Sequence, residues 1–356
     1  MNPSIWLAAT TPAERATAAL VVGLCASLPA SAECRLVQFA ELPVNASQNR
    51  PVVPGAINGQ PVRILVDTGA QLSVITRATA KRLSLMQLST SGSARGIGGE
   101  TYVYSTSVKQ LTLDKYSVRN LTLPVIAVDA GPAFDMILGE NFFSHSTVEF
   151  DLAHSAIRLF DPKGCHAEQL SYWSTAYQLA DLIASPVDSN RIETTVLLNG
   201  KALRAVLDTG AMFSIVSLTA AATAGVTPDS PGVKPAGRWH GVGRNVVDSW
   251  IGTFDSFTIG DETIRNAKLV IQDRTKSDEV KALQSRIPVS VEASPMLIGA
   301  DFFLAHRVLI YGAERKMVFT YLGGPVFDTL HVHPEAPTAA GSDDRPQTQQ
   351  PPDGPR

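Results

Sequence analysis

The feature that most constrains the fold of this chain is an internal repeat centred on one acidic turn. Leu65–Ile75 reads LVDTGAQLSVI and Leu207–Val216 reads LDTGAMFSIV, so the two aspartates lie 141 residues apart. An Asn-Gly pair precedes each turn at the same offset, at Asn58–Gly59 and at Asn199–Gly200. Asn-Gly between β-branched runs is a strong signal for a two-residue β-hairpin. The repeat therefore predicts two halves that fold alike, each with a hairpin that leads into an acidic turn.

The repeat continues beyond the turn. Ala-rich segments at 76–83 and 218–225 predict a short helix in each half. The matched pairs that follow, at offsets of 145, 146 and 160, are Gly96–Gly99 with Gly241–Arg244, Leu111–Ile126 with Phe257–Ile271, and Ile137–Phe143 with Leu297–Phe303. The largest step coincides with a charged insertion at Gln272–Arg286, which a surface loop tolerates at little cost. Order and spacing thus agree over most of each half.

The strand patterns indicate an all-β fold class. The apolar runs are short, alternating or β-branched, and Gly, Asn, Asp and Pro bound them. We expect two pseudo-symmetric β-barrel lobes, each closed by a short helix, with a cleft between them. The expected segments are a signal peptide at 1–32, an N-terminal lobe at 33–160, an interlobe linker at 161–189, a C-terminal lobe at 190–322 and a disordered Pro-rich tail at 334–356. Within the linker, Leu170, Trp173, Tyr177 and Ala180 predict an amphipathic helix.

The N-terminus has the pattern of an export signal. Ala16–Leu28 is an uncharged run too short to span a bilayer, and Ala30-Ser31-Ala32 is an A-x-A cleavage pattern. A buried N-terminal helix is the alternative. After cleavage Cys34 and Cys165 remain, and we predict that they form one disulfide in an oxidising compartment, periplasmic or extracellular. Two unpaired cysteines that pack as small hydrophobic residues are the other interpretation.

Composition excludes some partners. The chain is 44% hydrophobic and 18% charged, with a net charge of −3, so there is no electrostatic reason to expect nucleic acid or an anionic membrane as partner. No stable membrane insertion is expected once the signal is removed. His331 and His333 have no third ligand nearby, and we found no zinc-protease, serine-elbow or phosphate-loop motif. No cofactor or metal is therefore expected.

The duplication gives the two aspartates a chemical interpretation. Asp67 and Asp208 each follow an apolar strand, and a single such residue is best explained as the start of a turn. If two lobes pair about a pseudo-two-fold axis, the two turns can face each other. Two carboxylates in contact cannot both ionise readily and share one proton. Such a pair can activate water and protonate a carbonyl oxygen, which is direct hydrolysis of an amide.

These motifs resemble those of the retropepsin-like aspartic proteases. That family combines Asp-Thr-Gly-Ala after an apolar run, a Gly-rich flap, and two apolar residues with Gly before a short helix. The chain shows all three motifs twice, like a fused version of a protein that is otherwise assembled from two identical chains. The resemblance implies an aspartic endopeptidase that is complete as a monomer and acts on peptides or proteins.

The resemblance also implies roles for individual residues. Asp67 and Asp208 would be the catalytic pair. Their supporting residues would be Thr68, Gly69, Thr209 and Gly210. The substrate-binding residues would be Ala70 and Ala211 with the flap residues Gly96, Ile97, Gly98, Gly99, Gly241, Val242 and Gly243. The position that is often basic in the terminal helix of the family holds Glu140 in one half and Ala300 in the other.

Two other functions remain open on the sequence alone. A peptide-binding protein could keep the fold and lose turnover, although a binding protein needs neither acid. A structural exported domain could use both turns only as packing corners.

Overall fold

The computed structural model describes residues 33–96, 99–126, 133–144, 146–184, 191–240, 246–273 and 294–327. The expected signal peptide and the expected C-terminal tail lie outside these residues. Within them, no helix is both long enough and apolar enough to cross a bilayer.

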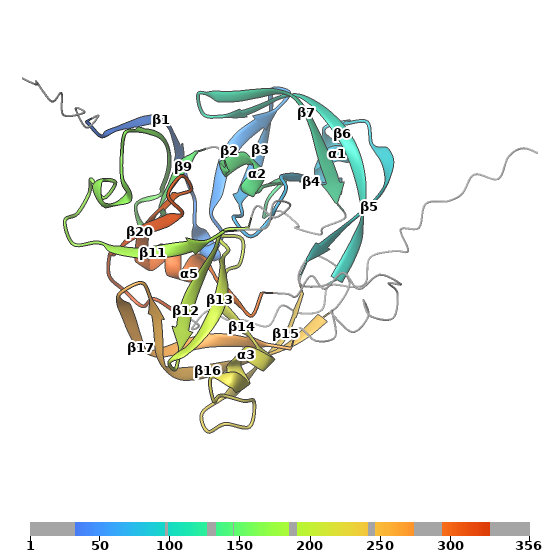
Figure 1. Ribbon diagram of the computed structural model, residues 1–356. Coiled ribbons are helices and arrows are strands. Elements are labelled where there is room, and N and C mark those ends of the chain that lie inside the picture. The colour runs from blue at the N-terminus through green and yellow to red at the C-terminus, as the bar shows by residue number, and fades with distance from the viewer. Residues whose placement is uncertain are drawn as a thin grey trace, which may run out of the picture. The chain divides into compact units, whose positions relative to one another are not determined.

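The first half forms a β-sheet of seven strands (Figure 1). In spatial order the strands are β2 (Val52–Ile57), β3 (Gln60–Val66), β8 (Met136–Leu138), β4 (Val74–Thr76), β7 (Tyr116–Ile126), β6 (Gly99–Leu113) and β5 (Leu88–Gly96). β2 also pairs with β6, so that the strands from β2 to β6 in this order form a closed barrel. β5 extends the barrel as the outer arm of a long hairpin with β6.

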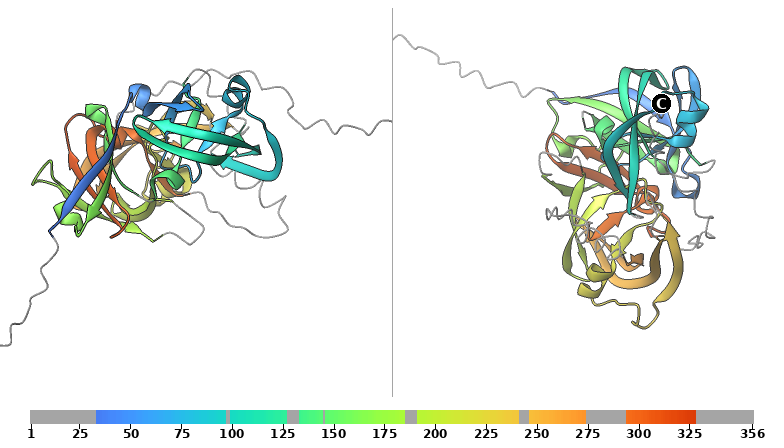
Figure 2. Two further views of the ribbon diagram at one scale, coloured as in Figure 1. Left: turned by 90° about the horizontal axis from the view of Figure 1, so that it is seen from above. Right: turned by 90° about the vertical axis from the view of Figure 1, so that its right-hand side faces the viewer.

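The second half repeats this arrangement strand for strand. Its spatial order is β12 (Glu193–Leu198), β13 (Lys201–Leu207), β18 (Met296–Ile298), β14 (Ile215–Ser217), β17 (Glu262–Gln272), β16 (Val246–Ile259) and β15 (Lys234–His240). β12 pairs with β16 and closes the second barrel. In the right-hand view of Figure 2 the blue-to-teal and the yellow-to-orange strands form two separate bodies. The expected all-β fold with two pseudo-symmetric lobes is therefore confirmed.

The turns and helices that the repeat predicted are present in both lobes. Each Asn-Gly pair forms a two-residue hairpin loop in which both residues have positive φ. The Ala-rich segments form α1 (Arg77–Arg82) and α3 (Leu218–Thr223), capped by the side chains of Thr76 and Ser217. A short helix also follows the last barrel strand of each lobe, namely α2 (Glu140–Phe143) and α5 (Ala300–Ala305).

A six-stranded antiparallel segment joins the two halves. Its spatial order is β1 (Arg35–Pro43), β10 (Ala156–Lys163), β9 (Thr147–Asp151), β19 (His306–Tyr311), β20 (Lys316–Tyr321) and β11 (Gln178–Ile183). At its centre β9 pairs with β19, and Glu149 lies opposite Leu309, its counterpart at offset 160. A residue that pairs with its own counterpart lies on the pseudo-two-fold axis. The register of β9 and β19 therefore places that axis.

The expectation of a linker helix was wrong. Residues 170–177 form turns, with a single 3-10 turn at Ala167–Gln169 before them, and the chain then enters β11. β11 pairs with β20 on one side and β12 on the other, so its backbone groups are used in the sheet. Leu170 is buried nonetheless, and the half-buried Trp173 packs beside it in a cluster that includes Cys165. Cys34 and Cys165 form the predicted disulfide, which links the start of β1 to this cluster.

Candidate active site

The aspartates of the two repeats are positioned by equivalent backbone contacts. Asp67 follows β3 and Asp208 follows β13, each beside the short buried strand β8 or β18. Oδ1 of Asp67 accepts hydrogen bonds from the backbone N–H groups of Gly69 and Ala70, at 3.0 and 2.9 Å. Oδ1 of Asp208 accepts from Gly210 and Ala211, at 3.0 and 3.1 Å. These bonds fix one oxygen of each carboxylate and leave the other oxygen directed elsewhere.

The two aspartates face each other across the lobe boundary. A side chain on Gly69 would overlap the carboxyl group of Asp208, and a side chain on Gly210 would overlap that of Asp67. Each carboxyl group therefore lies directly over the glycine of the opposite turn. Glycine is required at both positions because only its backbone admits so close an approach.

This proximity affects the ionisation of Asp67. Burial, the negative charge of Asp208 and a hydrogen bond with that carboxyl group raise the pKa of Asp67 well above its usual value. The backbone N–H groups of Ala70 and Gly69 act in the opposite direction and are outweighed. A pair in this state holds one proton between two carboxyl groups.

Two threonines join the turns. Oγ1 of Thr68 donates to the carbonyl of Leu207 at 2.7 Å, and Oγ1 of Thr209 donates to the carbonyl of Val66 at 2.8 Å. Each hydroxyl also accepts from the backbone N–H of the other threonine, at 3.0 and 3.1 Å. Both side chains are buried. The four crossed bonds satisfy both threonine hydroxyls and both threonine N–H groups and hold the lobes in register.

A second pair of supports was missed by the sequence reasoning. The hydroxyl of Ser73 donates to Oδ1 of Asn141 at 2.9 Å, and that of Ser214 donates to Oδ1 of Asp301 at 2.7 Å. The same hydroxyls accept from the backbone N–H groups of Gly139 and Gly299, at 3.0 and 2.9 Å. They tie the acidic turn to the following helix in each lobe. The two serines are separated by the repeat offset of 141, and Asn141 and Asp301 by the offset of 160. These matching offsets were the sequence signal for the two supports.

The candidate substrate-binding residues are only partly described. Gly96 pairs with Gly99 at the end of the β5–β6 hairpin, which places these two glycines at its tip. His240 pairs with Val246 at the end of the equivalent β15–β16 hairpin. Ile97, Gly98, Gly241, Val242 and Gly243 lie outside the described residues. Ala70 and Ala211 lie in the turns, where their carbonyls accept from the first residues of α2 and α5 at 2.8 Å.

The two sides of the site differ just after the turns. Leu72 is 53% exposed, whereas its counterpart Phe213 is 5% exposed and packs in a cluster of its own lobe. The side-chain amide of Asn49, from the segment before β2, donates to the carbonyl of Met212 at 3.0 Å. The pseudo-symmetry of the carboxyl pair therefore does not extend to the surrounding surface.

Comparisons with known proteins match each half of the chain to an aspartyl protease family model. Residues 53–145 match the family model described as "gag-polyprotein putative aspartyl protease", and residues 194–302 match the model described as "Aspartyl protease". Among solved structures, the aspartic proteinase from Irpex lacteus is similar, with a TM-score of 0.46 at 12% identity over 79% of this chain and 97% of that one. The comparison with curated protein sequences gave no match. Each family match contains one aspartate turn and at least the first residues of the short helix that follows the last barrel strand. The chain therefore belongs to the retropepsin-like aspartic proteases, with two family domains in tandem.

Proposed function

We propose that this protein is an aspartic endopeptidase in which Asp67 and Asp208 activate water for the hydrolysis of a peptide bond. The observation that carries the proposal is the contact between the two carboxyl groups. The crossed threonine hydrogen bonds join the two turns that hold these groups. A structural turn needs neither a second aspartate opposite it nor a raised pKa.

The arrangement supports a mechanism without a covalent intermediate. The ionised carboxyl group takes a proton from a water molecule, whose oxygen forms a bond to the carbonyl carbon of the substrate. The protonated carboxyl group donates its proton to the carbonyl oxygen, which gives a tetrahedral diol. Proton transfer to the amide nitrogen then allows the C–N bond to break. The raised pKa of Asp67 supports this scheme because it keeps one proton on the pair at a pH where an isolated aspartate would be ionised.

The substrate class follows from the surroundings of the pair. The β5–β6 and β15–β16 hairpins offer strand edges to which an extended peptide can bind by main-chain hydrogen bonds. We propose that Ala70, Ala211 and the tips at 96–99 and 241–243 contact this peptide. Because one chain carries both turns, we expect the site to be complete in a monomer.

The central test replaces each aspartate separately. Asp67→Asn and Asp208→Asn should each lower the rate of peptide cleavage by about 10²- to 10⁴-fold, because each removes one partner of the proton transfer. Wild-type activity should show a bell-shaped pH profile, since the pair must hold one proton. Cleavage is measured on a peptide library by mass spectrometry, with thermal unfolding as the check that the variants are folded.

Asp255→Asn, at an exposed position on β16, is the matched control and should leave activity unchanged. A folded D67N protein that retained full turnover would contradict the proposed mechanism. A wild-type protein that bound peptides with no turnover would identify the chain as a peptide-binding member of the same fold.

We also propose that the protein is exported to the periplasm or the extracellular space. The Cys34–Cys165 disulfide supports this proposal, because disulfides persist in oxidising compartments. N-terminal sequencing of protein recovered outside the cytoplasm should find Glu33 as the first residue. Recovery of the chain only in the cytoplasm, with residues 1–32 attached, would contradict this proposal.

A further inference from the structure

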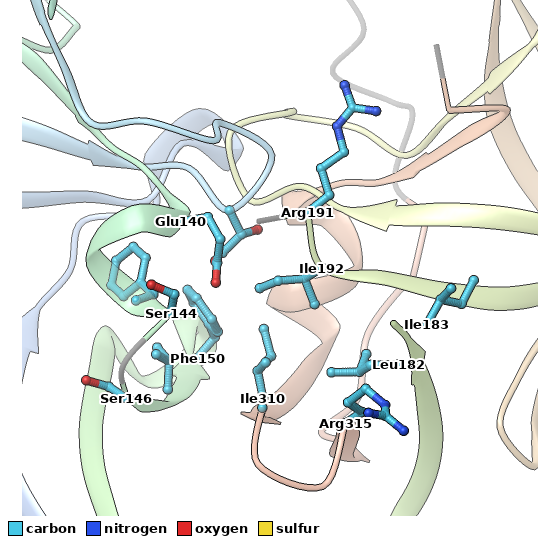
Figure 3. Close-up of a pocket in the computed structure, with 14 residues that line it drawn as sticks. Glu140, Ser144, Ser146, Phe150, Leu182, Ile183, Arg191, Ile192, Ile310 and Arg315 are labelled. Atoms are coloured by element: carbon cyan, nitrogen blue, oxygen red, sulfur yellow. The ribbon is translucent and has the colours of Figure 1, made fainter. Parts of the chain in front are cut away.

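A pocket of about 200 Å³ lies close to the paired turns and is built by both halves of the chain (Figure 3). Thr68 contributes to its lining from the first turn, Ile192 from the segment before β12, and Gly312 from the loop after β19. Its apolar lining comes mainly from α2, β9, β11 and β19 and consists of Phe143, Val148, Phe150, Leu182, Ile183 and Ile310. None of these residues belongs to the proposed catalytic machinery except Thr68.

One carboxyl group of this pocket is not used by the protein. Glu140, the first residue of α2, is 7% exposed, and its Oε2 is fully buried with no hydrogen-bond partner in the described part of the chain. In Figure 3 its carboxyl group is directed into the pocket, toward Ile192 and Phe150. An unpaired buried carboxyl oxygen is costly, and a protein normally satisfies such a group. The equivalent position in the second lobe is Ala300, so the fold itself does not need an acid here.

The other charged residues that line the pocket lie at its margin. These are Arg191 and Arg315, and in Figure 3 both side chains extend away from the carboxyl group of Glu140. The remaining polar lining residues are Ser144, Ser146 and Thr68. Thr68 directly follows Asp67 in the chain, so the titratable carboxyl group of Asp67 lies near this pocket. Among these lining residues, Glu140 is the one that carries a carboxyl group, and it lies beside an apolar wall.

We propose that this pocket binds a small primary ammonium ion with a short hydrocarbon chain, held by Glu140. The ammonium group would donate to the unpaired Oε2 and pair with its charge, and the chain would pack against the phenylalanine, isoleucine and leucine side chains. The size is adequate, because a cavity of about 150 Å³ holds benzene, and hexylamine has seven non-hydrogen atoms. The site is separate from the proposed catalytic pair and does not depend on its activity.

The ionisation of Glu140 gives the proposal a characteristic pH dependence. Burial raises its pKa to about 8, so the group is protonated at neutral pH. An ammonium ion binds the ionised form and must displace that proton. Affinity should therefore rise about tenfold per pH unit up to about pH 8 and level off above it, while the amine keeps its charge until about pH 10. A neutral ligand of the same shape should show no such rise.

The experiment is calorimetric titration of the purified full-length protein with hexylamine, and with hexan-1-ol as the neutral analogue, at pH 6, 7, 8 and 9. We expect hexylamine to bind about tenfold more tightly at pH 7 than at pH 6. Titrations at pH 6.5 in two buffers of different ionisation enthalpy should show release of nearly one proton per bound amine. Hexanol should bind with an affinity that does not increase with pH.

Variants locate the site. Glu140→Gln keeps the shape of the side chain and should remove both the pH dependence and most of the affinity for hexylamine. Ile192→Trp fills the pocket and should block binding without changing Glu140. Asp301→Asn, a buried acid of the second lobe outside the pocket lining, and Asp67→Asn should both bind hexylamine as the wild type does.

Three results would overturn the proposal. The first is no binding of hexylamine at pH 8 at concentrations up to about 20 mM, where a weak ligand with a dissociation constant near 1 mM would saturate the site. The second is equal binding of amine and alcohol with no dependence on pH. The third is loss of binding in the folded D67N protein with retention in E140Q, which would place the amine at the aspartate pair.

Discussion

At the scale of single residues, burial distinguishes two equivalent hydrogen-bond acceptors, one in each lobe. Asn141 and Asp301 occupy equivalent positions, and each accepts from the hydroxyl and the backbone N–H of an equivalent serine. Asn141 is exposed, but Asp301 is buried. Burial raises the pKa of Asp301 to about 7, although the bonds from Ser214 act to lower it. Asp301 therefore keeps its proton at pH values at which its hydrogen bonds alone would leave it ionised.

Asp301→Asn should make stability less dependent on pH. The folded protein holds the Asp301 proton up to about pH 7, whereas the unfolded chain releases it near 3.8. Between these values the wild type loses up to about 1.4 kcal/mol of unfolding free energy per pH unit through this group, and the loss stops above pH 7. Urea unfolding of both proteins from pH 4 to pH 8 should show the variant gaining stability relative to the wild type as the pH rises.

Asn141→Asp is the reciprocal control. The new carboxyl group would have the same serine donors but an exposed position, so no comparable loss of stability with rising pH is expected. An equal loss of stability with rising pH at the exposed position 141 would show that burial is not the cause of the raised pKa of Asp301.

At the scale of elements, the hairpin turns are set by backbone conformation. Asn199 and Gly200 have φ of 48° and 74°, and Asn58 and Gly59 have 51° and 80°. Such angles suit a type I′ turn, whose twist matches that of the flanking strands. The side chain of Asn199 adds a bond to the carbonyl of Ala224 at 2.9 Å and one from the N–H of Ser256 at 3.1 Å. The turn thus sets the register of β12 against β13, the strand that leads into Asp208.

Gly200→Ala should destabilise the protein by about 1–2 kcal/mol. No neighbouring atom lies within 4 Å of the added methyl group, so the cost comes only from the left-handed backbone. Gly312→Ala is the control, because it also meets open space but needs no positive φ, and it should change stability by less than about 0.5 kcal/mol. Equal effects of the two substitutions in chemical unfolding would contradict the assignment of the cost to φ.

At the scale of the whole molecule, the disulfide and the central strands join segments far apart in the chain. Cys34 and Cys165 are separated by 131 residues, a span that contains the whole first barrel. Beside the disulfide, the N–H of Trp173 donates to Thr320 on β20 at 3.1 Å, and Arg307 on β19 lies over the Trp173 ring. The disulfide therefore anchors β1 to a cluster built from both halves.

Replacing both cysteines by serine should lower the unfolding free energy by about 2–5 kcal/mol, because the unfolded chain regains the freedom of a long closed loop. Wild-type protein unfolded in the presence of a reducing agent should lose the same amount. The oxidised wild type should show no reactive thiol after unfolding, once residues 1–32 are removed. A double variant as stable as the oxidised wild type would show that the crosslink does not constrain the unfolded state.

Much of the candidate site was predictable because its signals are local and repeated. The turn at Asp67 and its copy at Asp208, the two Asn-Gly loops and the short helices each occupy a few consecutive residues. The pairing of Cys34 with Cys165 followed from cysteine count. The supporting roles of Ser73 and Ser214 were not predicted, because a serine near a turn can form many different hydrogen bonds. Its role here depends on a partner distant in the sequence.

Strand period, turn chemistry and helix caps are properties of neighbouring residues. The amino-acid sequence alone therefore specified two similar β lobes, each with an acidic turn after a buried strand. Tertiary contacts were needed to establish that β11 is a strand and not a helix, that Glu149 meets Leu309 on the pseudo-two-fold axis, and that Oε2 of Glu140 is buried with no hydrogen-bond partner in the described part of the chain. These features depend on contacts between separate segments of the chain, and nothing in the local pattern of one segment specifies which other surface will cover it.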